Sequence, residues 1–429
     1  MRLISGYVST AAAVAILFTG HLSAEDRSES DLFKADLSKL VVVGDSLSAG
    51  VQNFSLLDKQ QPNGYASVIA RQAGVSLVLP LIPFPGAPNV LQLTPKGIVP
   101  VDGTLPAIPR DNPCEQPTNV SVPGVTLEQA LALVPTPTPS SDPVQGWVDI
   151  VLGFPNPFAS AACHTSGPAS TEIQQAVALK PTTVIEWLGN NDALVPALTG
   201  TLNTLTPLFT FATSYEAALD ALAKTGAPII TATIPDVTKV PYFTPVASLA
   251  ARLNMPVDTV ARKLGIGTQD FLRPSAVPIA QSILSNGPGS LQKPCPVPLA
   301  GLPASSIPCV LTARDAERVR YTTDAYNFII FVESITHGAV LVDIHGLVNN
   351  IARNGVTANG QHLTTAFLGG LFSLDGIHPS NTGYAVIANA FIQQMNESLS
   401  TAIPPANLDQ IAASDPLVVK PSGGTPLSK

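Results

Sequence analysis

Short apolar runs rich in β-branched residues recur along the chain and predict buried strands. Runs without polar alternation are typical of parallel strands, whose two faces are both covered by other elements. Gly44 comes directly after the first run, and glycine often follows such a strand. The runs are Leu40–Val43, Val184–Leu188, Ile229–Ile234 and Ala339–Val342, with Val75–Leu79 as a weaker fifth.

Segments with apolar residues at helical spacing lie between these runs. They cover residues 65–72, 215–224, 313–335 and 381–395. Strands that alternate with helices favour an α/β fold with a central parallel sheet. We therefore expect one α/β domain over residues 38–398.

Two long segments interrupt this alternation. Residues 79–168 and 241–312 are rich in proline and contain all four cysteines. Loops of this length are usually functional or disordered, and the cysteines within them, as candidate disulfide partners, favour order. We interpret both segments as ordered insertions. Residues 401–429 are rich in Pro, Ser and Gly, and we expect them to form a flexible C-terminal tail.

Composition narrows the class of protein. Of the 429 residues, 45% are hydrophobic and only 12% are charged, which excludes a largely disordered chain. The formal net charge is −8, from 22 basic and 30 acidic residues, so the electrostatic signature of a nucleic-acid-binding protein is missing. No apolar stretch reaches the ~20 residues that a membrane span requires. Peripheral membrane contact through the apolar insertions stays open.

The N-terminus has the pattern of a secretory signal peptide. Arg2 precedes an apolar stretch from Ala11 to Phe18, and the small-residue site Leu22-Ser23-Ala24 follows. We expect residues 1–24 to be removed and the mature chain to be exported to the periplasm or the medium. The alternative is an N-terminal helix that is retained.

An even number of cysteines in an exported chain predicts two disulfides. Three pairings are possible. We favour Cys114 with Cys163 and Cys295 with Cys309, because each pair then closes one insertion. Zinc ligation is the rival interpretation, but the chain has no C-x-x-C spacing.

Ser46 is the first candidate for chemistry. It lies in Gly44-Asp45-Ser46-Leu47, directly after the first strand. In an open parallel sheet, ligands bind just beyond the carboxyl ends of the strands, so a substrate can reach this position. The structural alternative is that Ser46 only caps the next helix.

A serine nucleophile needs a base and a group that orients the base. Asp375 and His378 lie three residues apart in Asp375-Gly376-Ile377-His378, so one turn brings the carboxyl group to the imidazole. Taken alone, a D-x-x-H pattern is more often structural.

Two further segments offer donors for an oxyanion. Asn191 lies in Gly189-Asn190-Asn191-Asp192 after a predicted strand, and its amide can stabilise negative charge that develops on a substrate. Gly124 precedes a helix-like run and can expose its backbone N–H in the same way. The alternatives are a helix cap at 191–192 and an ordinary turn at Gly124.

These four segments, in this order, resemble the GDSL, or SGNH, family of serine esterases and lipases. The resemblance implies a flavodoxin-like three-layer α/β/α sandwich and no metal or organic cofactor. It implies that Ser46 is the nucleophile, and that Asp375 and His378 are the orienting acid and the base. It also implies an oxyanion hole formed by the Ser46 backbone N–H, Gly124 and Asn191. The chain departs from compact members in the long separation of Ser46 from Gly124 and in the second insertion.

The resemblance predicts a secreted hydrolase that cleaves carboxylic esters, of lipids or other acylated molecules, through an acyl-enzyme. Two alternatives remain open. An acyltransferase would use the same acyl-enzyme, and a non-catalytic envelope protein would bind an acyl or glycan ligand on the same fold. The sequence indicates neither the natural ester nor the oligomeric state.

Overall fold

The computed structural model describes residues 35–137, 140–153, 163, 169–286, 290–291, 295 and 307–418. The predicted signal peptide, residues 1–24, therefore lies outside the described residues, as do residues 419–429.

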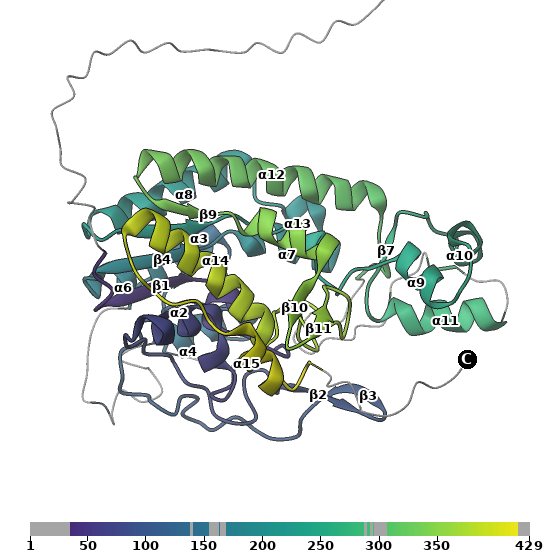
Figure 1. The fold of residues 1–429 in the computed structure, drawn as a ribbon, viewed down its shortest axis with the longest axis horizontal. Helices are drawn as coiled ribbons and strands as arrows, with labels where there is room; N and C mark the ends of the chain where they lie inside the picture. The colour runs from purple at the N-terminus through teal and green to yellow at the C-terminus, as the bar shows by residue number, and fades with distance from the viewer. Residues whose placement is uncertain are drawn as a thin grey trace, which may run out of the picture. The chain divides into compact units, whose positions relative to one another are not determined.

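Four parallel strands form the central sheet (Figure 1). In sheet order they are β1 (Leu40–Gly44), β4 (Thr183–Trp187), β5 (Ile229–Ala232) and β9 (Val340–Val342). Val42 pairs with Ile185 and Ile185 with Ile230. These are the four strongest apolar runs of the sequence, so their prediction as buried parallel strands is confirmed.

The predicted fifth strand is wrong in its position. Residues 75–79 form no strand, and residues 118–122 lie beside β1 instead. The backbone N–H of Val42 donates to Thr118 O, and Val120 N donates to Val42 O, both at 2.9 Å. Val120 is fully buried, whereas Val75 is only half-buried, so the more completely covered segment occupies the sheet edge. Part of the supposed first insertion thus belongs to the sheet, which acquires the flavodoxin-like order.

Helices cover both faces of the sheet because successive side chains of a strand point in opposite directions. Val41 and Val43 of β1 pack into one core, and Leu40 and Val42 pack into the other. The predicted three-layer α/β/α sandwich is confirmed. The first core lies against α3 (Leu127–Ala132), α4 (Pro143–Leu152), α6 (Glu172–Ala178), α7 (Asn190–Thr199), α8 (Leu208–Ala223) and α12 (Ala313–Thr336), and the second against α2 (Tyr65–Ala73), α13 (Ile344–Asn354), α14 (Asn381–Leu399) and α15 (Leu408–Ser414).

Aromatic packing reinforces both cores. Tyr65 stacks on Phe391 with ring centroids 4.8 Å apart and meets Trp187 edge-on at 5.4 Å. On the other face, Phe211 stacks on Tyr326 at 4.0 Å. These contacts fasten α2 and α14 to β4, and α8 to α12.

Smaller elements complete the fold. The one-turn helix α1 (Ser46–Ala49) follows β1, and a hairpin of β2 (Leu91–Thr94) and β3 (Gly97–Pro100) lies in the first insertion. A second hairpin joins β10 (Val356–Ala358) to β11 (Gln361–Leu363). The short 3₁₀ helices are η1 (Gln61–Asn63), η2 (Leu202–Thr204) and η3 (Val237–Lys239).

The second insertion has a core of its own. A small antiparallel sheet, with strand β7 (Phe271–Leu272) between β6 (Thr244–Pro245) and β8 (Val310–Leu311), packs with three helices. These helices are α9 (Val246–Arg252), α10 (Val257–Leu264) and α11 (Ala276–Asn286).

The two disulfides are those favoured from the sequence. Cys114 pairs with Cys163, and Cys295 pairs with Cys309, with Cα–Cα distances of 5.2 and 4.8 Å. Because all four thiols are used in this way, the zinc interpretation is wrong.

The C-terminal segment differs from the expected flexible tail. Helix α15 packs on α14, and the backbone N–H and the hydroxyl of Thr382 both donate to Asp415 at 2.8 Å. Burial of Ile403 and Ala412 holds residues 401–418 against the domain. None of the described helices is long and apolar enough to cross a membrane.

Arg273 ties the second insertion to α7. Its guanidinium donates to the backbone carbonyls of Ala197, Leu198 and Pro308 at 2.7 to 3.0 Å, and the residue is 1% exposed. Burial lowers the pKa of Arg273 to about 10, so the group stays charged at neutral pH. A cation at the carboxyl end of a helix is favourably placed.

We therefore expect Arg273→Met to lower the free energy of unfolding by about 2–4 kcal/mol, because three carbonyls, two of them in buried contacts, lose their donor. Urea denaturation followed by circular dichroism measures this. The exposed Arg252→Met is the matched control, with an expected change below about 0.5 kcal/mol. Equal effects of the two substitutions would contradict the anchoring role of Arg273.

Candidate active site

The sequence motifs meet at the carboxyl edge of the sheet. Ser46 follows β1, Asn191 follows β4, and Gly124 follows the edge segment 118–122. His378, from the loop before α14, joins them, because Ser46, Asn191 and His378 line one cavity. Gly124 is not among the described residues that line this cavity.

Ser46 is the first residue of α1 and is 9% exposed. Asp45 caps this helix by accepting a hydrogen bond from Leu47 N at 3.0 Å. The turn requires glycine at position 44, because a Cβ there would overlap the Ser48 side chain and lie 2.9 Å from Trp187 O. The strand-to-helix turn thus brings Ser46 to the cavity.

Asp375 accepts four hydrogen bonds. Its Oδ2 accepts from His378 Nδ1 at 2.9 Å and from Phe54 N at 2.6 Å. Its Oδ1 accepts from the backbone N–H groups of Ile377 and His378, at 2.7 and 2.8 Å. An ionised carboxylate only accepts hydrogen bonds, so Nδ1 of His378 carries a proton and Nε2 is left as the basic nitrogen.

Burial alone would raise the pKa of the Asp375 carboxyl. The charge of His378 and the hydrogen bonds from its ring and backbone, together with that of Ile377, outweigh burial and hold the pKa below its usual range. Asp375 is therefore ionised at neutral pH, although it is only 3% exposed.

Sequence reasoning missed the turn at Asn53 and Phe54. Both residues have positive φ, 50° and 59°, which is unusual for a bulky side chain. This conformation directs Phe54 N to Asp375, while Asn53 Oδ1 accepts from Leu374 N at 3.0 Å. No local pattern in the sequence indicates a contact between residues 321 positions apart.

Gly376 requires the freedom of glycine. Its φ is +70°, and a Cβ there would lie 3.0 Å from Tyr242 N. The same N–H donates to Gly376 O at 2.8 Å, so the Asp375–His378 turn rests directly on the start of the second insertion.

The Asn191 amide is held in place by a neighbouring loop. Nδ2 donates to Val125 O at 2.9 Å, which uses one of its two protons and leaves the other for a ligand. Gly124 lies one residue earlier with a φ of +82°. Asp192 accepts from Leu127 N at 2.9 Å and so connects the start of α7 to the start of α3. The Gly124 and Asn191 segments are therefore adjacent.

Comparison with known proteins decides the family. The GDSL-like lipase/acylhydrolase family model matches residues 40–391, most of the chain. The chain belongs to this family. As a GDSL-like acylhydrolase it is a carboxylic ester hydrolase, and the family predicted from the four motifs is confirmed. No curated protein sequence matches the chain.

Solved structures show weaker similarity. One is LAE5, an α/β hydrolase from the metagenome of Lake Arreo in Spain, with 14% identity, coverage of 86% of this chain and 100% of that chain, and a TM-score of 0.37. Another is a variant of an acetyl xylan esterase from Geobacillus stearothermophilus, with 12% identity, coverage of 84% and 96%, and a TM-score of 0.36. Similarity of this extent supports no conclusion about substrate.

Apart from its motif residues, the cavity of this GDSL-like hydrolase is apolar. Its polar groups come from the loops that carry Ser46, Asn191 and His378, and from Trp187 at the end of β4. Trp187 Nε1 and Asn190 Oδ1 are buried without a hydrogen-bond partner. The apolar lining consists of Leu47, Leu194, Pro235, Val237, Val240, Ile344, Val348, Phe372, Ile377, Pro379 and Ile387.

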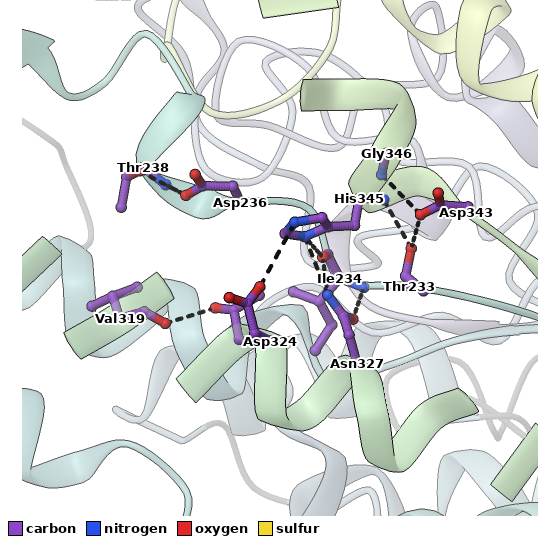
Figure 2. Close-up of polar contacts among 11 residues, drawn as sticks. Thr233, Ile234, Asp236, Thr238, Val319, Asp324, Asn327, Asp343, His345 and Gly346 are labelled. Carbon is purple, nitrogen blue, oxygen red and sulfur yellow. Dashed lines mark hydrogen bonds and ion pairs between the residues drawn. The ribbon is translucent and has the colours of Figure 1, made fainter. Parts of the chain in front are cut away.

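A polar network binds the start of α13 to the segment after β5 (Figure 2). Asn327 of α12 accepts from Ile234 N at 2.7 Å and donates to Ile234 O at 2.9 Å, just after β5. His345 of α13 lies against the same carbonyl, with Nδ1 at 3.1 Å, and its backbone N–H donates to Thr233 at 2.8 Å. The start of α13, which brings Ile344 to the cavity, is thereby bound to the sheet.

Three buried carboxyl groups lie beneath the motifs. Burial raises the pKa of Asp45 to about 6 and that of Glu186 to about 7, and it raises the pKa of Glu172 well above its usual range. The charge of Asp45 raises the pKa of Glu172 and Glu186 further, and the charge of Asp192 raises that of Asp45. Asp45 accepts from Asn190 Nδ2 at 2.9 Å, and Glu172 accepts from Gly44 N at 2.6 Å, so both support the loops of the site.

The raised pKa of Glu186 predicts how the free energy of unfolding depends on pH. Because its pKa is raised from 4.5 to about 7, the folded state binds more protons than the unfolded state between these values. The free energy of unfolding therefore falls as pH rises through this window, by about 3 kcal/mol from this group. We expect Glu186→Gln to remove that part of the pH dependence, since an amide can still bond to Leu188 N and Tyr215 OH.

Urea unfolding at pH 4.5 and pH 8 tests this. The free energy of unfolding of the variant, minus that of the unsubstituted protein, should be larger at pH 8 than at pH 4.5. Glu216→Gln, at an exposed position of α8, serves as the control. An identical pH slope in Glu186→Gln would show that Glu186 is not responsible.

Proposed function

We propose that this chain hydrolyses carboxylic esters through an acyl-enzyme on Ser46, with His378 as the base and Asp375 as its orienting acid. The observation that carries this proposal is the cavity shared by Ser46 and His378, together with the 2.9 Å bond from His378 Nδ1 to Asp375. Nucleophile, base and orienting group are the parts that such catalysis requires.

In the first half of the reaction, Nε2 of His378 removes the Ser46 proton as Ser46 Oγ attacks the ester carbonyl carbon. The carbonyl oxygen becomes an oxyanion, which we assign to the Ser46 backbone N–H, Gly124 N–H and the second proton of Asn191 Nδ2. The contact of Asn191 with Val125 O supports this assignment, because it orients the amide before substrate binds.

The tetrahedral intermediate collapses when His378 returns the proton to the leaving alcohol, and Ser46 keeps the acyl group. In the second half, His378 removes a proton from water, which attacks the acyl-enzyme. Release of the acid restores Ser46 and its proton. The ionised Asp375 stabilises the imidazolium that forms in both halves.

We further propose that the protein acts outside the cytoplasm after loss of residues 1–24. The two disulfides indicate a chain that folds in an oxidising compartment, which supports export.

Ser46→Ala should abolish labelling by a fluorescent fluorophosphonate and reduce hydrolysis of p-nitrophenyl butyrate by at least about a thousandfold. Ser48→Ala is the matched control, since Ser48 lies two residues further on and bonds to Tyr65. It should keep both labelling and hydrolysis. Labelling that survives in a folded Ser46→Ala protein would refute the nucleophile assignment.

Asn191→Ala should lower kcat by about 10²–10³-fold with little change in KM, because an oxyanion donor acts mainly in the transition state. Asn190→Ala removes a bond to Asp45 instead, so it should reduce the free energy of unfolding and lower kcat by less than about tenfold. Steady-state kinetics with p-nitrophenyl butyrate distinguish the two. A rise in KM at constant kcat would assign Asn191 to ground-state binding.

A further inference from the structure

Two cavities lie side by side behind the proposed nucleophile. The first, of about 60 Å³, is the one lined by Ser46 and His378. The second, of about 40 Å³, is lined by residues of α13, α14 and the segment before Asp375. Val348, Phe372, Pro379 and Ile387 line both, so these side chains stand between them.

The lining indicates what the first cavity can hold. Its polar groups are confined to the motif loops and Trp187, and the side chains from η3, α13 and α14 are aliphatic. Such a wall offers no partner to a hydroxyl group, a sugar or a charge, whereas burial of an alkyl chain there is favourable. The natural occupant is an unbranched hydrocarbon chain.

The reaction order places the acyl group of the ester in this cavity. The alcohol must leave and water must enter before deacylation, while the acyl group remains on Ser46. A pocket with apolar walls suits the group that stays, and a departing alcohol would lose its hydrogen bonds there. This step rests on the proposed function.

The volume limits the length of that chain. At about 10–15 Å³ for each water-sized group, the first cavity accepts roughly four to six carbons. The second would add about three or four more. Of the shared residues, Val348 and Ile387 lie on different helices and away from the Asp375–His378 turn. The contacts of His345 with Thr233, Ile234 and Asn327 hold the start of α13 in place (Figure 2).

We propose that the first cavity is the acyl pocket of a short-chain esterase and that Val348 and Ile387 form the partition that limits acyl length to about six carbons.

The test measures kcat/KM for p-nitrophenyl esters from acetate to dodecanoate, below their micellar concentrations. The unsubstituted protein should gain about fourfold for each added methylene up to hexanoate and then lose activity. Ile387→Ala opens the partition, so the ratio of decanoate to butyrate kcat/KM should rise at least tenfold. Val348→Phe fills the first cavity, so the ratio of butyrate to acetate kcat/KM should fall at least tenfold.

Ile392→Ala is the matched control, because Ile392 is a buried residue of the same helix that lines neither cavity. It should leave the chain-length profile unchanged. Thermal unfolding and fluorophosphonate labelling of each variant report folding and an intact Ser46.

Several results would overturn this inference. One is an unchanged profile in labelled, folded Ile387→Ala, and another is an optimum at dodecanoate in the unsubstituted protein. A third is a preference that follows the alcohol in methyl, butyl and hexyl acetate rather than the acyl group. Absence of both labelling and hydrolysis is a different outcome, because it would refute the proposed function itself.

Discussion

The carboxylate of Asp375 is the constraint on which the arrangement of the site depends. It collects four N–H donors from two segments that are far apart in sequence, the turn before α14 and the loop after α1. A buried charge is tolerated only when it is fully hydrogen-bonded, so these donors must meet at one point. The positive φ of Phe54 is the local strain that this requirement imposes. The imidazole of His378 is oriented as a result.

The buried acids beneath the site follow a different logic. Asp45, Glu172 and Glu186 have raised pKa values because they are buried, whereas Asp375 has a lowered pKa because the His378 ring and three backbone N–H groups donate to it. Carboxyl groups in the same buried region thus have different pKa values, because their charged and hydrogen-bonding neighbours differ. The three acids with raised pKa values accept hydrogen bonds from Gly44, Asn190 and Leu188 near the carboxyl edge of the sheet. Because their pKa values are raised in the folded state, the free energy of unfolding falls as pH increases.

The insertions have distinct relations to the site. Part of the first supplies the sheet edge that ends near Gly124, so it is an integral part of the fold. The second has its own core and disulfide. It contacts the site where Tyr242 N donates to Gly376 O, and it contacts the end of α7 through Arg273. The cavity beside Ser46 is instead walled by α13, α14 and η3. The acyl pocket that we propose there is therefore formed by elements of the sandwich itself.

The sequence by itself determined the four strands and the motif residues, and it favoured the disulfide pairing that the structure has. Continuous apolar runs and short motifs are local signals, and Asp375 and His378 are close enough to meet within one turn. It could not place residues 118–122 at the sheet edge, because Asn119 and Ser121 interrupt their apolar pattern and only packing shows that this segment is more deeply buried than residues 75–79. Nor could it reveal the bond from Phe54 to Asp375, the packing of residues 401–418 against the domain or the two cavities that Ile387 lines. These depend on contacts between distant segments, which only the tertiary structure brings together.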